Sequence, residues 1–151
     1  MDKLGIYLPI GIVVLIFFLK LFVNESFSFE TFKRVFVGTP IDITSLGISF
    51  MISYIITTAN KILHLETISN IDQPQLEILK LNWNNFAKGL IILFFYVIIL
   101  VIIVFISKHF ISKYSEIEKM RYIILGSVLG YALALPTMAY SIYLVESIGG
   151  M

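Results

Sequence analysis

Hydroxyl side chains at a fixed spacing are the first feature of this sequence that could do chemistry. They recur every four residues, a spacing that places them along one face of a helix. Such a face has two interpretations: it packs closely on another helix with its hydroxyls bonded to their own backbone, or it lines a pore in an oligomer. We expect the packing role and keep the pore as the alternative. The residues are Ser45, Ser49, Ser53 and Thr57.

Residues for catalysis or metal binding are scarce. The chain has no Cys, which excludes disulfides and thiolate chemistry, and its two His share no obvious cluster of carboxylates. No convergent group of ionisable residues lies inside the apolar segments, as an active site would require. We therefore expect a non-enzymatic protein with no cofactor and no metal site. The net charge of +1 gives no footprint for direct nucleic-acid binding.

The elements that position the hydroxyl face must be membrane helices, because 58% of the 151 residues are hydrophobic and the mean hydropathy is +0.94. The run Gly89–Ser107 contains no charged residue, amide, His or Pro. At about 1.5 Å per residue, it covers roughly the 30 Å of a bilayer's hydrocarbon core. We predict an all-α integral membrane protein in which residues 1–151 form a single transmembrane domain. The four predicted spans are residues 4–23, 40–58, 89–107 and 122–145.

The second span is predicted to begin at a proline. Thr39 precedes Pro40 and Asp42 follows it, which is the pattern of an N-cap, a first-turn proline and an acid near the helix N-terminus. The amphipathic residues 24–38 fit either a short helix lying in the membrane interface, which we expect, or a connecting loop. Lys20, near the end of the first span, is expected to extend its ammonium group to the lipid headgroups.

The third and fourth helices also have start signals. Asp72 predicts the start of a helix that protrudes from the membrane before it enters as the third span, although the alternation around Leu76–Leu81 also permits a short strand. Ser115 and Glu118 form a capping-box pattern at the start of the fourth helix. Small residues lie on one face of that helix, and span two carries the hydroxyl stripe. Because such stripes permit close packing, we expect spans two and four to form the inside contact while spans one and three face lipid. These small residues are Gly126, Gly130 and Ala134.

Basic residues in the connections predict the orientation. They are more numerous after the first and third spans, which places those connections in the cytoplasm and both chain termini outside. The residues are Lys33, Arg34, Lys108, Lys113, Lys119 and Arg121.

The order of the segments resembles a known membrane subunit. Residues 39–43, reading TPIDI, open a serine-bearing span that continues through Leu46–Ile56, and the last span contains Gly130–Tyr140. In this plan the whole chain resembles the small four-span membrane subunit of the Kiwa antiphage defence system. The resemblance implies a homo-oligomer, a tetramer, in the bacterial inner membrane. It also implies a sensor or scaffold that engages a soluble DNA-binding protein on the cytoplasmic side, where the basic residues would form the partner-binding surface.

Three classes of function fit these patterns. The first is a non-enzymatic membrane sensor or anchor in a multiprotein complex, the second a pore or channel using the serine face, and the third a small transporter or membrane enzyme. The third is disfavoured because no charge is expected near the middle of any span, where coupled transport usually needs one. We expect the first.

Overall fold

The structure, a computed structural model, describes residues 3–23, 29–68, 72–113 and 120–149, and it contains no strand within these ranges. Three of its helices are long and apolar enough to cross a membrane, whereas α1 carries a shorter apolar stretch, Gly11–Lys20. The all-α fold is confirmed, and the chain has the helices of a multi-pass membrane protein. The helices are α1 (Lys3–Val23), α2 (Phe29–Glu66), α3 (Gln73–Lys113) and α4 (Met120–Gly149).

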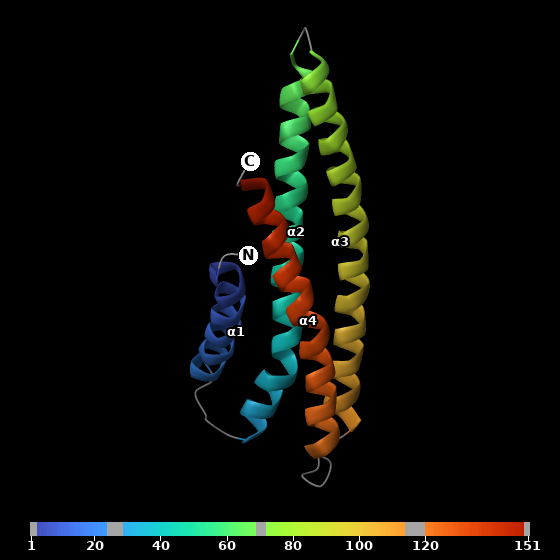
Figure 1. Cartoon of the computed structure of the whole chain (residues 1–151). Helices are drawn as coiled ribbons and strands as arrows, with labels where there is room; N and C mark the ends of the chain where they lie inside the picture. Colours follow the sequence, from blue (N-terminus) through green and yellow to red (C-terminus); the bar gives the residue numbers. More distant parts are fainter. Residues whose placement is uncertain (1–2, 24–28, 69–71, 114–119, 150–151) are drawn as a thin grey trace.

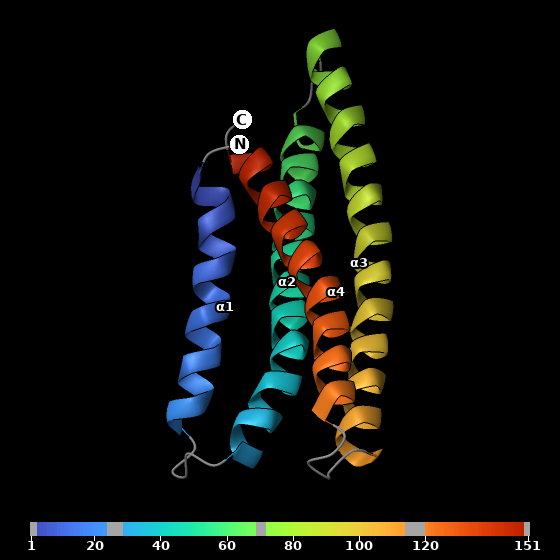
Figure 2. The same cartoon turned by 60° about the horizontal axis from the view of Figure 1, so that its bottom comes forward.

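The helices run alternately up and down the molecule (Figure 1). The most extensive contact joins α2 to α4, the next joins α2 to α3, and α1 packs on α2 and α4. Figure 2 shows that α2 and α3 form a long hairpin that projects beyond the neighbouring ends of α1 and α4. The predicted protrusion of the third helix is therefore present, and the end of α2 accompanies it.

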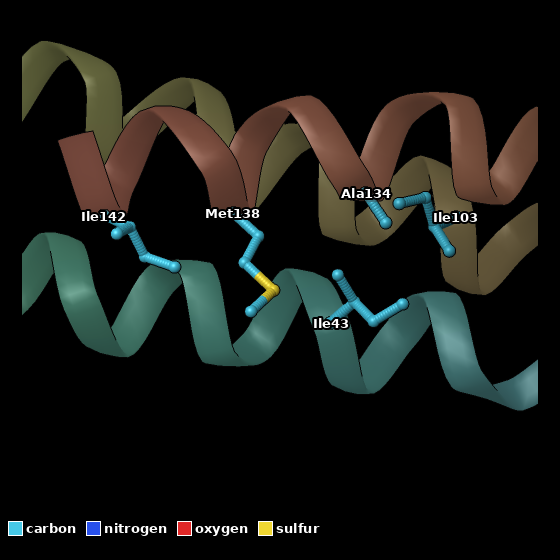
Figure 3. Close-up of a cluster of buried hydrophobic side chains, with 5 residues drawn as sticks. All are labelled: Ile43, Ile103, Ala134, Met138 and Ile142. Carbon is cyan, nitrogen blue, oxygen red and sulfur yellow. The ribbon is translucent and has the colours of Figure 1, made fainter. Parts of the chain in front are cut away.

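Buried side chains from α2, α3 and α4 meet in one cluster (Figure 3). The predicted contact between spans two and four is confirmed. However, α3 also contributes Ile103 to this cluster and buries Tyr96, so it faces outward only in part. Its outer side includes Ile98, which is exposed as expected, whereas Val104 is half-buried. The members of the cluster are Ile43, Ile103, Ala134, Met138 and Ile142.

Two glycines allow α2 and α4 to approach closely. A Cβ added at Gly47 would lie 3.2 Å from the Cα of Met138, so the two backbones meet at this point. A Cβ at Gly130 would lie 3.1 Å from Cγ of Pro40, so the proline ring occupies the space that a side chain would need. Small residues permit such contacts between membrane helices.

Contacts to α3 fix the level of α2 along the bundle. Ser107 Oγ donates a hydrogen bond to the carbonyl of Val37 at 3.2 Å. At the other end of the uncharged run, a Cβ on Gly89 would lie 3.0 Å from Cγ1 of Ile55. The part of α2 between Val37 and Ile55 therefore lies beside the segment of α3 that matches the hydrocarbon core.

The predicted helix start at Thr39 and Pro40 is wrong. Helix α2 begins at Phe29 and passes through Pro40 without interruption. Thr39 is not an N-cap: its Oγ1 donates to the carbonyl of Val35 at 2.7 Å, and Thr44 Oγ1 donates to the carbonyl of Pro40 at 2.9 Å. Membrane helices tolerate proline where hydroxyl side chains and neighbouring helices contact the disturbed turn. The expected interfacial helix is thus the first part of α2.

The start of α3 is confirmed by reciprocal capping bonds. Gln75 N donates to Asp72 Oδ1 at 2.9 Å, and Asp72 N donates to Gln75 Oε1 at 3.2 Å. These bonds use two of the backbone donors that a helix start leaves without a partner. The predicted capping box of Ser115 and Glu118 lies outside the described residues.

Candidate functional site: the polar face of helix α2

The predicted hydroxyl stripe is part of a longer polar face on α2. All its members fall on one side of the helix, because they are separated by three or four residues. The hydroxyl and amide members and the histidine are exposed in the single chain. The part up to Ser53 lies at the depth of the hydrocarbon core, and the rest lies beyond Ile55. We call this set the polar face: Asp42, Ser45, Ser49, Ser53, Thr57, Asn60 and His64.

Two hydroxyls at membrane depth, those of Ser45 and Ser49, are bonded to their own helix. Ser45 Oγ donates to the carbonyl of Ile41 at 2.8 Å, and Ser49 Oγ donates to the carbonyl of Ser45 at 3.0 Å. Each hydroxyl has one proton and two lone pairs, so the donor is used and the lone pairs remain available as acceptors. The bonds are those expected for a packing face. Ser45, Ser49 and Ser53 are exposed among the described residues, so a second protein chain could pack against this part of the face.

An ion pair lies at the inner end of the polar face. Lys20 Nζ of α1 donates to Asp42 Oδ2 of α2, with the side chains 39% and 36% exposed. Asp42 follows Val37 by little more than one helical turn, which places it about 7 Å inside the hydrocarbon core. Ionisable groups at this depth are costly and are commonly found paired with one another.

The ion pair between Lys20 and Asp42 shows that the predictions for both residues are wrong. The Lys20 ammonium contacts a carboxylate on a neighbouring helix rather than extending to the headgroups. Asp42 is not in the first turn of a helix, since α2 begins at Phe29. The two residues are far apart in the sequence, and the antiparallel packing of α1 on α2 brings them together. The sequence did contain a signal for this ion pair, because one apolar segment carries a lysine and another carries an aspartate.

Helix α4 also reaches the charged end of the polar face. Tyr131 packs against Phe36 with ring centroids 5.4 Å apart. A Cβ on Gly130, the residue before Tyr131, would lie 3.1 Å from Cγ of Pro40, so α4 meets α2 two residues before Asp42. Three helices therefore contact this part of the membrane-embedded site.

The outer end of the polar face opens into a groove between α2 and α3. The groove has a volume of about 510 Å³ and lies in the part of the hairpin beyond the apolar run. It shares Thr57, Asn60 and His64 with the polar face, and Lys61 and Asn82 add further polar groups. The polar face thus runs from an ion pair inside the membrane to a polar groove outside it.

The two other predicted groups of site residues are each gathered by the fold. The small residues Gly126, Gly130 and Ala134 are buried. The basic residues mark one end of the bundle, where α2 and α4 begin and α3 ends (Figure 1). Those within the helices are Lys33, Arg34, Lys108, Lys113 and Arg121, and Lys119 lies outside the described residues.

Comparison of this chain with protein-family models, with curated proteins and with solved structures found no match. Within the described ranges, no three His, Asp or Glu side chains lie close enough together to hold a metal ion. The chemistry that the site offers is hydrogen-bond acceptance along a helix face, one ion pair and a polar groove. These groups suit recognition, assembly or the passage of a polar solute.

Proposed function

We propose that this chain is a non-enzymatic, homo-oligomeric membrane subunit that serves as a sensor or anchor in a multiprotein complex. The observation that carries the proposal is the polar face, which points outward at the depth of the hydrocarbon core. Lipid tails cannot form hydrogen bonds, so a polar face at this depth favours contact with protein or water over contact with lipid. A second copy of the chain, presenting the same face, supplies that contact.

The fourth span belongs to the same proposal. Helix α1 has 21 residues, which at about 1.5 Å per residue reaches roughly 30 Å. It packs alongside α2 and α4 and contributes Ile12 and Val13 to the border of the central cluster. We therefore treat α1 as a transmembrane helix that is held to the other three by packing and by the Lys20–Asp42 pair.

The two ends of the bundle support a sensor or anchor. At one end, the α2–α3 hairpin extends beyond the apolar run and exposes Leu63, Ile78 and Leu81, which are each more than half exposed. Exposed apolar side chains outside the membrane are typical of protein-binding surfaces. At the other end lie the basic residues, which the positive-inside rule assigns to the cytoplasm.

Three finer parts of the proposal come from the resemblance to the Kiwa membrane subunit. These are a tetrameric assembly, a soluble partner that binds the basic end, and a role in antiphage defence.

Charge reversal tests the partner: the double variant Lys108→Glu, Arg121→Glu should lose a cytoplasmic protein that copurifies with the wild type. Lys80→Glu, at the opposite end, should retain it. Equal loss in both variants would contradict a partner site at the basic end.

A pore lined by the polar face is the second candidate function. It is favoured by the lone pairs of the exposed Ser45 and Ser49, which remain available as acceptors because the hydroxyl protons are used internally. In a ring of subunits, such oxygens would line a passage that accepts hydrogen bonds from water or contacts hydrated cations. The groove beside Thr57 would form its mouth.

Disulfide crosslinking tests the shared basis of both candidates. The chain has no Cys, so a single introduced Cys reports only contacts between copies. We expect Ser49→Cys to form a covalent dimer in membranes treated with a mild oxidant. The matched control is Val101→Cys on α3, where the side chain is 63% exposed on the outer surface. No crosslinking at Ser49, or equal crosslinking at Val101, would refute assembly through the polar face.

A further inference from the structure

A second cavity lies where the end of α1 meets the beginning of α2. It has a volume of about 340 Å³, and the described residues that line it are Leu19, Lys20, Val23, Arg34 and Val35. Three of these side chains are apolar and two are cationic, and none is acidic. The cavity is distinct from the groove at the outer end of the polar face, because it lies at the opposite, basic end of the bundle.

The cavity crosses the boundary between the hydrocarbon core and the headgroups. Val37 is level with Ser107, the last residue of the uncharged run of α3. Arg34 lies nearly one turn farther out, about 5 Å along the axis, and is exposed. Lys20 contacts Asp42 and therefore lies inside the boundary. The cavity is thus cationic at headgroup level, whereas the side chains that neighbour Lys20 in α1 are apolar.

This order of groups matches a phospholipid, which places a phosphate outside and acyl chains inside. The guanidinium of Arg34 has a planar set of donors that fits two phosphate oxygens, whereas the Lys20 ammonium is already directed to a carboxylate. Basic cavities between membrane helices on the cytoplasmic side bind the headgroups of anionic lipids. We infer that this cavity binds an anionic phospholipid, with Arg34 holding the phosphate and the apolar side chains of Leu19, Val23 and Val35 contacting the part of the lipid next to the phosphate.

The site has a role that the proposed function does not require. A lipid seated here would touch both α1 and α2 where few residues of the chain join them. It would add a contact to the Lys20–Asp42 pair and hold α1 against the bundle. The inference concerns a single chain, so it stands independently of oligomerisation and of any soluble partner.

Native mass spectrometry of the whole purified protein tests the inference. Phosphatidylglycerol, added to delipidated protein, should bind more tightly than phosphatidylcholine. Arg34→Gln should weaken phosphatidylglycerol binding by about tenfold, as expected for the loss of one charge-assisted pair. Arg34→Lys keeps the charge without the planar donor set and should weaken it less. Lys80→Gln, at the other end of the molecule, is the matched control and should leave binding unchanged.

Competition separates a lipid from a free phosphate. Excess inorganic phosphate should not displace phosphatidylglycerol, because it lacks the acyl region that fills the apolar part of the cavity. Full displacement would show a phosphate site without lipid and overturn the inference. Equal binding of the two lipids, or equal losses in Arg34→Gln and Lys80→Gln, would overturn it as well. Size-exclusion profiles that match the wild type confirm that both variants are folded.

Discussion

The two faces of α2 carry similar residues and meet different surroundings. On the buried face, Thr44 and Thr58 donate their hydroxyl protons to carbonyls one turn earlier, at 2.9 Å in each case. On the polar face, Ser45 and Ser49 do the same at 2.8 and 3.0 Å. The threonines are almost fully covered by neighbouring helices, whereas the serines are exposed. Hydrogen bonding within the helix therefore does not decide which face packs inside the chain.

The shape of each face decides which face of α2 packs inside the chain. The buried face combines a glycine with large apolar side chains, so that Gly47 admits the backbone of α4 while Met51 fills the space beside it. On the polar face, Ser45 and Ser49 remain exposed among the described residues. A stripe of small residues thus shows that close packing is permitted, and it does not show which chain supplies the partner.

The largest effect is expected at the point of closest approach on the buried face. Gly47→Leu should lower the free energy of unfolding by about 3 kcal/mol or more, because its Cβ alone would lie 3.2 Å from a backbone atom of α4. Unfolding in mixed SDS micelles, followed by circular dichroism, measures the change. Gly38→Leu on the same helix is the control, since a Cβ there meets nothing within 4 Å. Similar losses for both variants would show that leucine in α2, rather than the α2–α4 contact, causes the effect.

Replacing a small residue by leucine on the polar face should affect assembly rather than the stability of the single chain. Ser49→Leu should change the stability of the single chain by less than about 0.5 kcal/mol, as is usual at an exposed position. It should nevertheless shift the protein from oligomer to monomer, because the larger side chain holds the facing copies apart. Light scattering after size exclusion in detergent measures the mass. An oligomer that survives Ser49→Leu would place the interface elsewhere.

Much of the helical architecture follows from sequence patterns that act locally. The uncharged run of α3 and the capping residue Asp72 each depend on neighbours within a few residues, and both predictions held. The contact between spans two and four was expected from the serine stripe of α2 and the small residues of α4. The contact is present, but it uses Gly47 and Gly130, whereas Ser45, Ser49 and Ser53 are exposed in the single chain. Local patterns suffice here because hydrogen bonds within a helix and the thickness of the bilayer set these features.

The features that were missed depend on tertiary contacts. Thr39 before Pro40 has the pattern of a helix start, yet the same hydroxyl can donate to a carbonyl one turn earlier and remain inside a helix. The partner of Asp42 became evident only once α1 was placed beside α2. Likewise, Gly47 gave the closest backbone approach to α4, although the regular spacing of the serines was the stronger pattern.

A moderate effect is expected where α3 joins α4. Tyr96 Oη donates to the carbonyl of Thr137 at 2.8 Å in a buried position. Tyr96→Phe keeps the ring and removes this bond, so it should lower the free energy of unfolding by about 0.6 kcal/mol, the average for hydrogen bonds between membrane helices. Tyr143→Phe, with a half-exposed side chain, should have no measurable effect. If Tyr96→Phe and Tyr143→Phe change the free energy of unfolding equally, the hydrogen bond from Tyr96 to the Thr137 carbonyl does not stabilise the contact between α3 and α4.

The smallest effects should come from removing single hydroxyls, and they distinguish the two roles of the polar face. Thr44→Val and Ser49→Ala each delete a hydroxyl that is bonded to its own helix, so each should change stability by less than about 0.5 kcal/mol. Both variants should assemble normally, since Ala and Val fit the volumes they replace. Ion flux into liposomes then separates the candidates. If the polar face lines a pore, Ser49→Ala removes acceptor oxygens from the passage and changes the flux, whereas Thr44→Val does not. If the face only packs between copies, neither variant differs from the wild type, because the hydroxyl proton was already satisfied within the helix and the oxygen faced a packed surface. A change in flux in Thr44→Val alone would contradict both interpretations, since that side chain lies on the buried face.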